Sequence, residues 1–289
     1  MLSGIFQTNS EITSCLNQIK LMDYLKTILD AKKHQLQKIL PLEGKLRAAA
    51  ILRNDYAGFK TALDLGEDQL SIVPEIAKSY PHNPDFALDM DVLKQFTMFE
   101  QGRPQALSVQ TEPILHHGTW EMLAGISKKS TVPLLARDYF THPVEICQAV
   151  IYGADAINLV VAALTPNQLK ELHALAHGLG LDVMIEVSNF TELEIAMDVS
   201  EDLICINNTN PHTLKTYLNA THLLIEELPA STIVLASGGI ETPADAQLML
   251  EAGAHGIILQ DNLIQAHAPQ YLMQELSDVR LNTPYDGEE

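Results

Sequence analysis

The fold is decided by residues 131–164, which read TVPLLARDYFTHPVEICQAVIYGADAINLVVAAL. Residues 132–136 form a short apolar run, and Pro143 stands where a helix accepts proline in its first turn. Helical spacing continues to Gly153, which ends the helix, and residues 156–161 form a second apolar run. Nearly unbroken apolar strands that alternate with helices are typical of a parallel sheet buried on both faces.

The same alternation continues along the chain. Apolar runs predict strands at residues 70–76, 106–109, 132–136, 156–161, 183–187, 203–206, 233–236 and 256–259. Helical spacing predicts helices at residues 86–100, 120–128, 143–152, 167–179, 192–197, 211–227, 243–251 and 269–276. Eight strands, each followed by a helix, predict an α/β fold of the (β/α)8 TIM-barrel type. An open doubly wound sheet usually has a glycine-rich turn after its first strand, and AKSYPHNP stands there instead.

A further amphipathic helix is predicted at residues 21–40, ended by Pro41. Its lysines (Lys26, Lys32, Lys33 and Lys38) lie mostly off the apolar face. We expect residues 1–68 to form a helical extension that packs on the barrel of residues 69–289, so that the whole is one domain.

Composition excludes several classes of partner. The net charge of −19 disfavours nucleic acid and anionic membranes, because both require a basic surface. No apolar run reaches the roughly 20 residues that cross a bilayer, and the N-terminus has no signal-peptide pattern. The three cysteines lack metal-ligand spacing, and the histidine pairs His116–His117 and His173/His177 lack the further ligands of a zinc site. We expect a cytoplasmic protein with no metal and no cofactor.

Candidate site residues gather at the predicted strand ends, where parallel barrels place their chemistry. Glu75 and Glu186 are carboxylates at the ends of apolar strands, and each must be paired or functional because burying a lone charge is costly. Arg137 is the obvious partner for both. A purely structural ion-pair ring and a catalytic site both fit this pattern.

The stretch 131–164 and three later ones resemble indole-3-glycerol-phosphate synthase of tryptophan biosynthesis; the later stretches are LKELHALAHGLGLDVMIEVSNFTELEIAM, ICINNTN and ASGGIETPADAQLMLEAGAHGIIL. The resemblance implies a TIM barrel with extra N-terminal helices. It also implies a lyase that closes the ring of a carboxyphenylamino-deoxyribulose phosphate with loss of carbon dioxide and water. That chemistry needs a cation for the substrate carboxylate, acid and base groups, and a phosphate cradle.

Carried over position by position, the resemblance implies catalytic roles for Glu75, Glu186 and Asn207, with Arg137 in place of the third-strand lysine. It implies that a small-molecule ligand binds at the barrel mouth through Lys78, Tyr139, Ser237, Gly238 and Gly239. Other family positions differ: Ala77 replaces a lysine, Thr209 an arginine, Tyr80-Pro81-His82 a Ser-Pro-Ser motif, Ser237-Gly238 a Glu-Ser pair, and Gln260-Asp261 a glycine with a small or acidic neighbour.

These differences favour an impaired parent activity, because a guanidinium with a pKa above about 12 is a poor proton donor. Three interpretations stay open. The chain is a synthase that uses substitute residues such as Lys78, or a barrel that acts on another small ligand. Alternatively it is an inactive homologue with a binding or regulatory role. Whether a protein partner completes the site stays open as well.

Overall fold

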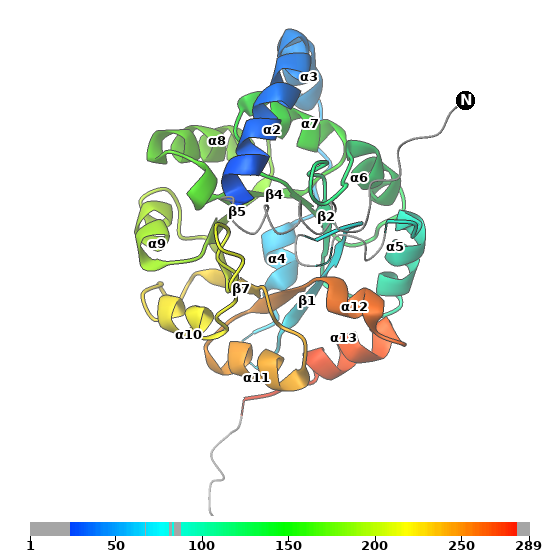
Figure 1. The fold of residues 1–289 in the computed structure, drawn as a ribbon, viewed down its shortest axis with the longest axis vertical. Coiled ribbons are helices and arrows are strands. Elements are labelled where there is room, and N and C mark those ends of the chain that lie inside the picture. The colour runs from blue at the N-terminus through cyan, green and yellow to red at the C-terminus, as the bar shows by residue number, and fades with distance from the viewer. Residues whose placement is uncertain (1–23, 67, 81–82, 84–87, 282–289) are drawn as a thin grey trace, which may run out of the picture.

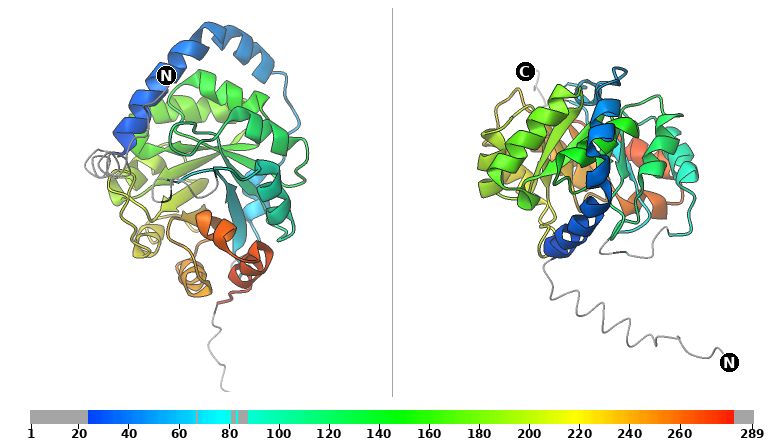
Figure 2. Two further views of the ribbon diagram at one scale, coloured as in Figure 1. Left: turned by 45° about the vertical axis from the view of Figure 1, so that its right-hand side comes forward. Right: turned by 90° about the horizontal axis from the view of Figure 1, so that it is seen from above.

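The computed structural model describes residues 24–66, 68–80, 83 and 88–281 of the chain. Its strands form one closed parallel barrel in the order β1 to β8, and β8 pairs with β1 (Figure 1). Helices surround this barrel on the outside (Figures 1 and 2). The predicted (β/α)8 barrel is therefore confirmed. No helix in the described part of the chain is long and apolar enough to cross a membrane.

The strand positions agree closely with the apolar runs. The strands are β1 Ser71–Ile76, β2 Leu107–Gln110, β3 Leu134–Arg137, β4 Ala156–Val160, β5 Asp182–Val187, β6 Leu203–Asn207, β7 Ile233–Ser237 and β8 Gly256–Leu259. The helices are α2 Tyr24–Ile39, α3 Glu43–Ala50, α4 Phe59–Leu63, α5 Val92–Glu100, α6 Trp120–Ser127, α7 Pro143–Ile151, α8 Pro166–Gly178, α9 Phe190–Met197, α10 Asn219–Ile225, α11 Pro243–Glu251, α12 Asp261–Gln265 and α13 Pro269–Ser277. Short 3-10 turns follow α2 and β4, at Leu40–Leu42 and Val161–Ala163.

The helix predicted over residues 211–227 was wrong at its beginning, because α10 starts only at Asn219. The Asn210 side chain accepts from the amides of His212 and Thr213, and Leu214 has a positive φ of 56°. These local bonds compete with a helix and fold the segment into a turn that pairs Thr209 with Thr216. The predicted helix starts at residues 21–23 and 86–87 lie outside the described residues.

Helix α4 closes the base of the barrel, which is the end where the strands begin. Phe59 and Leu63 are fully buried and pack in one cluster with barrel-facing side chains of the strands, among them Val73, Leu135 and Met184. The backbone amide of Lys60 donates to Asp182, the first residue of β5. The N-terminal segment therefore supplies a plug for the barrel interior.

Helix α2 lies at the opposite end and is anchored by a buried lysine. Lys32 is 2% exposed, and its Nζ lies 2.7 Å from Asp138 Oδ1 and 2.5 Å from Glu145 Oε1. Burial by itself lowers the pKa of Lys32, but the charges of Asp138 and Glu145 outweigh it and raise the pKa overall. Lys32 is thus the exception to the expectation that the lysines of this helix lie mostly off its buried face, since Lys26, Lys33 and Lys38 are exposed.

The remainder of the extension runs down the outside of the barrel between these two ends (Figure 2). Arg53 donates to the carbonyls of Val150 and Ala154 and to the carboxylate of Asp155, which precedes β4. The extension thus contacts the mouth through α2, the outer layer at α7, and the base through α4.

Replacing Lys32 with methionine tests the anchor. Lys32→Met leaves Asp138 and Glu145 buried without their counter-charge, so we expect the free energy of unfolding to fall by about 3–5 kcal/mol in a urea titration. Lys33→Met is the matched control, because Lys33 is exposed and its ion pair with Asp30 lies at the surface. Equal effects of the two variants would contradict the buried anchor.

Candidate active site at the barrel mouth

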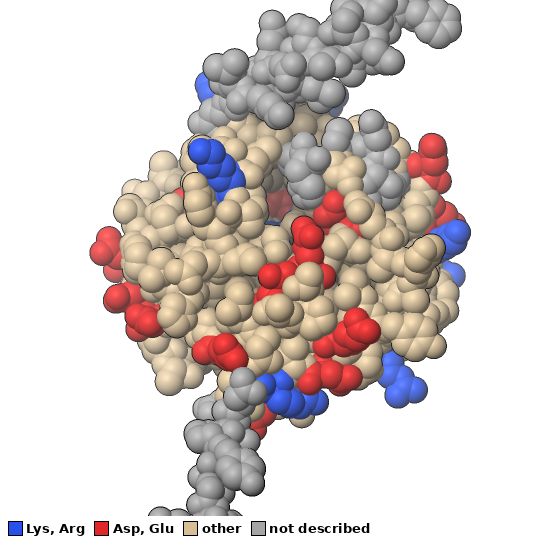
Figure 3. Space-filling view, turned by 60° about the horizontal axis from the view of Figure 1, so that its bottom comes forward, with Lys and Arg blue, Asp and Glu red and all other residues tan. Residues whose placement is uncertain are grey.

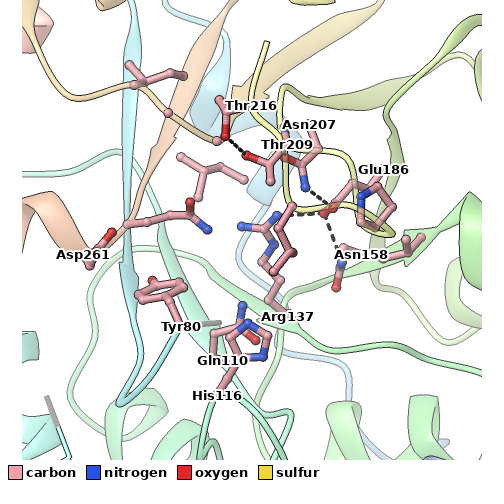
Figure 4. Close-up of a pocket in the computed structure, with 18 of the residues that line it drawn as sticks. Tyr80, Gln110, His116, Arg137, Asn158, Glu186, Asn207, Thr209, Thr216 and Asp261 are labelled. Atoms are coloured by element: carbon pink, nitrogen blue, oxygen red, sulfur yellow. Dashed lines mark hydrogen bonds and ion pairs between the residues drawn. The ribbon is translucent and has the colours of Figure 1, made fainter. Parts of the chain in front are cut away.

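The floor of the barrel mouth is built around the guanidinium of Arg137, the last residue of β3 (Figure 4). Its Nη1 donates to Glu75 Oε2 at 3.1 Å, and its Nη2 donates to Glu186 Oε2 at 2.8 Å. Glu75 comes from β1 and Glu186 from β5, which lie on opposite sides of the barrel. The prediction that Arg137 pairs with both glutamates is confirmed.

Glu75 is fully buried beneath the cavity and has three donors. Besides Arg137, the hydroxyls of Tyr80 and Ser108 donate to its two carboxylate oxygens at 2.8 and 2.9 Å. Burial alone would raise the pKa of Glu75, but the Arg137 charge and the hydroxyl donors outweigh it and hold the pKa below its usual value. Glu75 is therefore an ionised carboxylate whose bonding capacity is spent within the protein.

Glu186 faces the cavity and is fixed by neutral amides as well. Asn207 Nδ2 donates to Glu186 Oε1 at 2.8 Å, and Asn158 Nδ2 lies 3.4 Å from Oε2 (Figure 4). The Asn207 side chain is oriented in turn, because its Oδ1 accepts from the amide of Thr209. The structure thus brings together the four residues expected to be catalytic: Glu75, Arg137, Glu186 and Asn207.

The paired glycines after β7 also line the cavity. Gly238 and Gly239 have φ values of 83° and 73°, a region that disfavours other residues. A Cβ on Gly238 would lie 2.7 Å from Thr209 Oγ1, and one on Gly239 would lie 2.5 Å from Thr216 Cγ2. The turn between β6 and α10 therefore packs directly on the glycines. Ser237 is fully buried, accepts a weak hydrogen bond from the Cys205 thiol, and is not a lining residue.

Of the remaining candidates, Tyr139 lines the cavity and Lys78 does not. Burial raises the pKa of Tyr139, and the Glu186 charge adds to this, so its phenol stays protonated. Several other lining residues were visible as polar groups at strand ends, namely Gln110, Asp138, Asn158 and Asp261. Tyr24 of α2 was not foreseen, because nothing in a local helical pattern shows which distant site that helix covers.

The cavity has a volume of about 210 Å³ and an acidic lining. Its charged lining residues, within the described part of the chain, are Asp138, Glu186, Glu241, Asp261 and the one cation Arg137. On the face drawn in Figure 3, acidic side chains likewise outnumber basic ones. The described residues contain no group of three or more His, Cys, Asp or Glu side chains placed to hold a metal ion.

The Glu75 ion pair makes a pH-dependent contribution to stability. Since its folded-state pKa lies below 4.5, the stabilisation is complete above about pH 4.5 and is lost as the pH falls through the lower folded value. We expect Glu75→Gln to lower the unfolding free energy by about 3 kcal/mol at neutral pH. The difference in unfolding free energy between wild type and variant should narrow as the pH is lowered below about 4.5, which urea unfolding at each pH measures.

Glu171→Gln, on the exposed surface of α8, is the matched control and should leave the unfolding free energy unchanged. A gap between wild type and Glu75→Gln that stays constant across the pH range would show that the Glu75 charge is not stabilised in the folded protein.

Comparison with known proteins shows which family the sequence resembles. A family model for indole-3-glycerol phosphate synthase matches residues 25–276. The indole-3-glycerol phosphate synthase of Exiguobacterium sibiricum is 29% identical over 262 residues, which is 91% of this chain and 100% of the relative. The Streptococcus mutans enzyme of the same name is 35% identical over 227 residues, or 78% of this chain and 87% of the relative.

Solved structures share the barrel at much lower identity. The 3-hexulose-6-phosphate synthase of Salmonella typhimurium matches with a TM-score of 0.59 and 10% identity, covering 72% of this chain and 96% of that one. The tryptophan synthase alpha subunit of Legionella pneumophila matches with a TM-score of 0.55 and 14% identity, covering 77% and 97%. Such likeness shows the fold alone. The sequence matches go further, and by them the chain is a member of the indole-3-glycerol phosphate synthase family.

Proposed function

We propose that this chain binds a small molecule at the barrel mouth but carries out the ring closure of its family poorly. The observation that carries the proposal is the Arg137 guanidinium, which is held by both Glu75 and Glu186. The family reaction needs a proton donor for the substrate ketone and a second acid or base group. In this chain the residues at those positions are engaged with one another.

Proton transfer is the first difficulty for the parent reaction. A general acid works best with a pKa near the working pH, and a guanidinium stays charged at any such pH. Burial alone lowers the pKa of Arg137, but the Glu186 and Glu75 charges outweigh it and raise the pKa well above its usual value. Arg137 can polarise an oxygen electrostatically but does not give up a proton. Loss of general acid–base help costs about 10²–10⁴ in rate.

Phosphate binding is the second difficulty. Helix N-termini attract phosphate, but the start of α11 already holds a carboxylate of this chain. Asp245 Oδ2 accepts from the amides of Glu241 and Thr242 at 3.1 and 2.9 Å. Asp261 adds a second carboxylate at the beginning of α12, beside the cavity. A dianionic phosphate would approach both negative charges.

Two alternatives keep the same pocket. An inactive homologue would use it for binding or regulation, with or without a protein partner, and a barrel of changed specificity would act on another small ligand. The acidic lining and the carboxylate of Asp245 in the first turn of α11 favour these alternatives over an efficient synthase.

A turnover assay with the carboxyphenylamino-deoxyribulose phosphate tests the proposal. With the indole product followed by fluorescence, we expect less than about 0.1 turnover per second, at least 10² below the usual enzyme value of about 10 per second. The matched variant is Arg137→Lys, which keeps the positive charge but supplies a group that can transfer a proton. It should raise the residual rate by about tenfold or more. Wild-type turnover near 10 per second would defeat the proposal.

A further inference from the structure

Tyr24, at the beginning of α2, is a lining residue of the cavity whose hydroxyl has no hydrogen-bond partner among the described residues. Its side chain lines the cavity and the residue is only 6% exposed. Within the described part of the chain its hydroxyl oxygen is buried and makes no hydrogen bond. A buried hydroxyl without a partner costs about 1–3 kcal/mol, so such a group beside a cavity indicates a bonding partner supplied by a ligand.

The position of Tyr24 is fixed by the helix that carries it. Leu25 and Ile28 are buried on the same helix, and Lys32 binds Asp138 and Glu145 further along it. Burial raises the pKa of Tyr24, and the neighbouring Tyr139 and Glu112 add to this effect, so the phenol is neutral and can accept or donate. Tyr24 is therefore a preorganised hydrogen-bonding group at the mouth.

The electrostatics of the cavity select the charge of a ligand. On the floor of the mouth, the Arg137 guanidinium forms ion pairs with two carboxylates. The group of Glu75, Arg137 and Glu186 therefore has a net negative charge. At the rim, the carboxylate of the exposed Glu241 has no ion-pair partner among the described residues. Both features attract a cation and oppose an anion.

The remaining lining residues indicate that the uncharged part of the ligand is apolar. Apolar side chains from several strand ends and loops face the cavity, among them Val160, Leu214, Ile240 and Ile258. With a cavity volume of about 210 Å³, the ligand is a small molecule with a hydrocarbon part.

We propose that the mouth of this barrel binds a small, phosphate-free ligand with an apolar body and an ammonium group, and that the Tyr24 hydroxyl is one of its hydrogen-bonding partners. This proposal rests on the proposed function, because a mouth that processed the phosphorylated family substrate efficiently would have to bind an anion. The ammonium group lies between the acidic floor at Glu186 and the rim at Glu241. The apolar body contacts the aliphatic side chains.

Matched probes separate charge from shape. Isothermal titration of the full chain at constant ionic strength compares 2-phenylethylamine, which carries an ammonium group, with phenylacetate and inorganic phosphate. We expect the amine to bind about tenfold or more tightly than phenylacetate, and its affinity to fall as salt is raised. Equal or tighter binding of phenylacetate or phosphate overturns the proposal, and so does a failure of the amine to bind.

Conservative variants test the roles of Tyr24 and Glu241 in amine binding. Tyr24→Phe removes only the hydroxyl and should weaken amine binding about tenfold, and Glu241→Gln should weaken it about threefold or more. Tyr271→Phe, on the exposed face of α13, is the matched control and should bind like wild type. Unchanged binding by Tyr24→Phe overturns the role of that hydroxyl.

The two proposals fail in different ways. Efficient turnover of the phosphorylated family substrate would defeat the proposed function. Absence of turnover together with absence of amine binding, or with preferred anion binding, would leave the proposed function standing and overturn the ligand class.

Discussion

On the floor of the barrel mouth, the Arg137 guanidinium pairs with Glu75 and Glu186 from opposite sides of the barrel. The arrangement of the mouth depends on this contact. Burying three charged groups costs several kcal/mol for each ion, and such clusters persist only when their remaining bonding groups are satisfied. Tyr80 and Ser108 satisfy Glu75, whereas Asn158 and Asn207 satisfy Glu186. The floor is therefore a closed polar network with excess negative charge.

The N-terminal extension is held at both ends of the barrel. Helix α4 fills the base with Phe59 and Leu63, so the strands close around a packed interior. At the mouth, Lys32 of α2 forms an ion pair with Asp138, the residue that follows Arg137 in the chain. The same helix places Tyr24 at the cavity. The ion pairs of Lys32 at the mouth and the apolar contacts of α4 at the base thus hold the N-terminal extension at both ends of the barrel.

In the proposed function, the chemistry of this barrel differs from that of its family through the type of cation at the end of β3. An ammonium group can lose its proton at neutral pH when its surroundings lower its pKa, whereas a guanidinium cannot. Placed between two glutamates, a guanidinium is suited to holding them together. In the proposal made above, substitution at one strand end therefore changes a proton-transfer site into a structural clamp, and the acidity that remains sets the charge of the ligand.

The sequence by itself determined the barrel and the strand ends that meet at its mouth. Apolar runs and helical spacing are local signals, and parallel strand order places Glu75, Arg137 and Glu186 at one end, where opposite charges pair. Only the tertiary structure decided that Lys32 is buried and that Tyr24 lies at the mouth. It also decided that Lys78 lies outside the cavity and that residues 211–218 form a turn. Each of these outcomes depends on partners distant in sequence or on competing side-chain bonds, which a local pattern does not record.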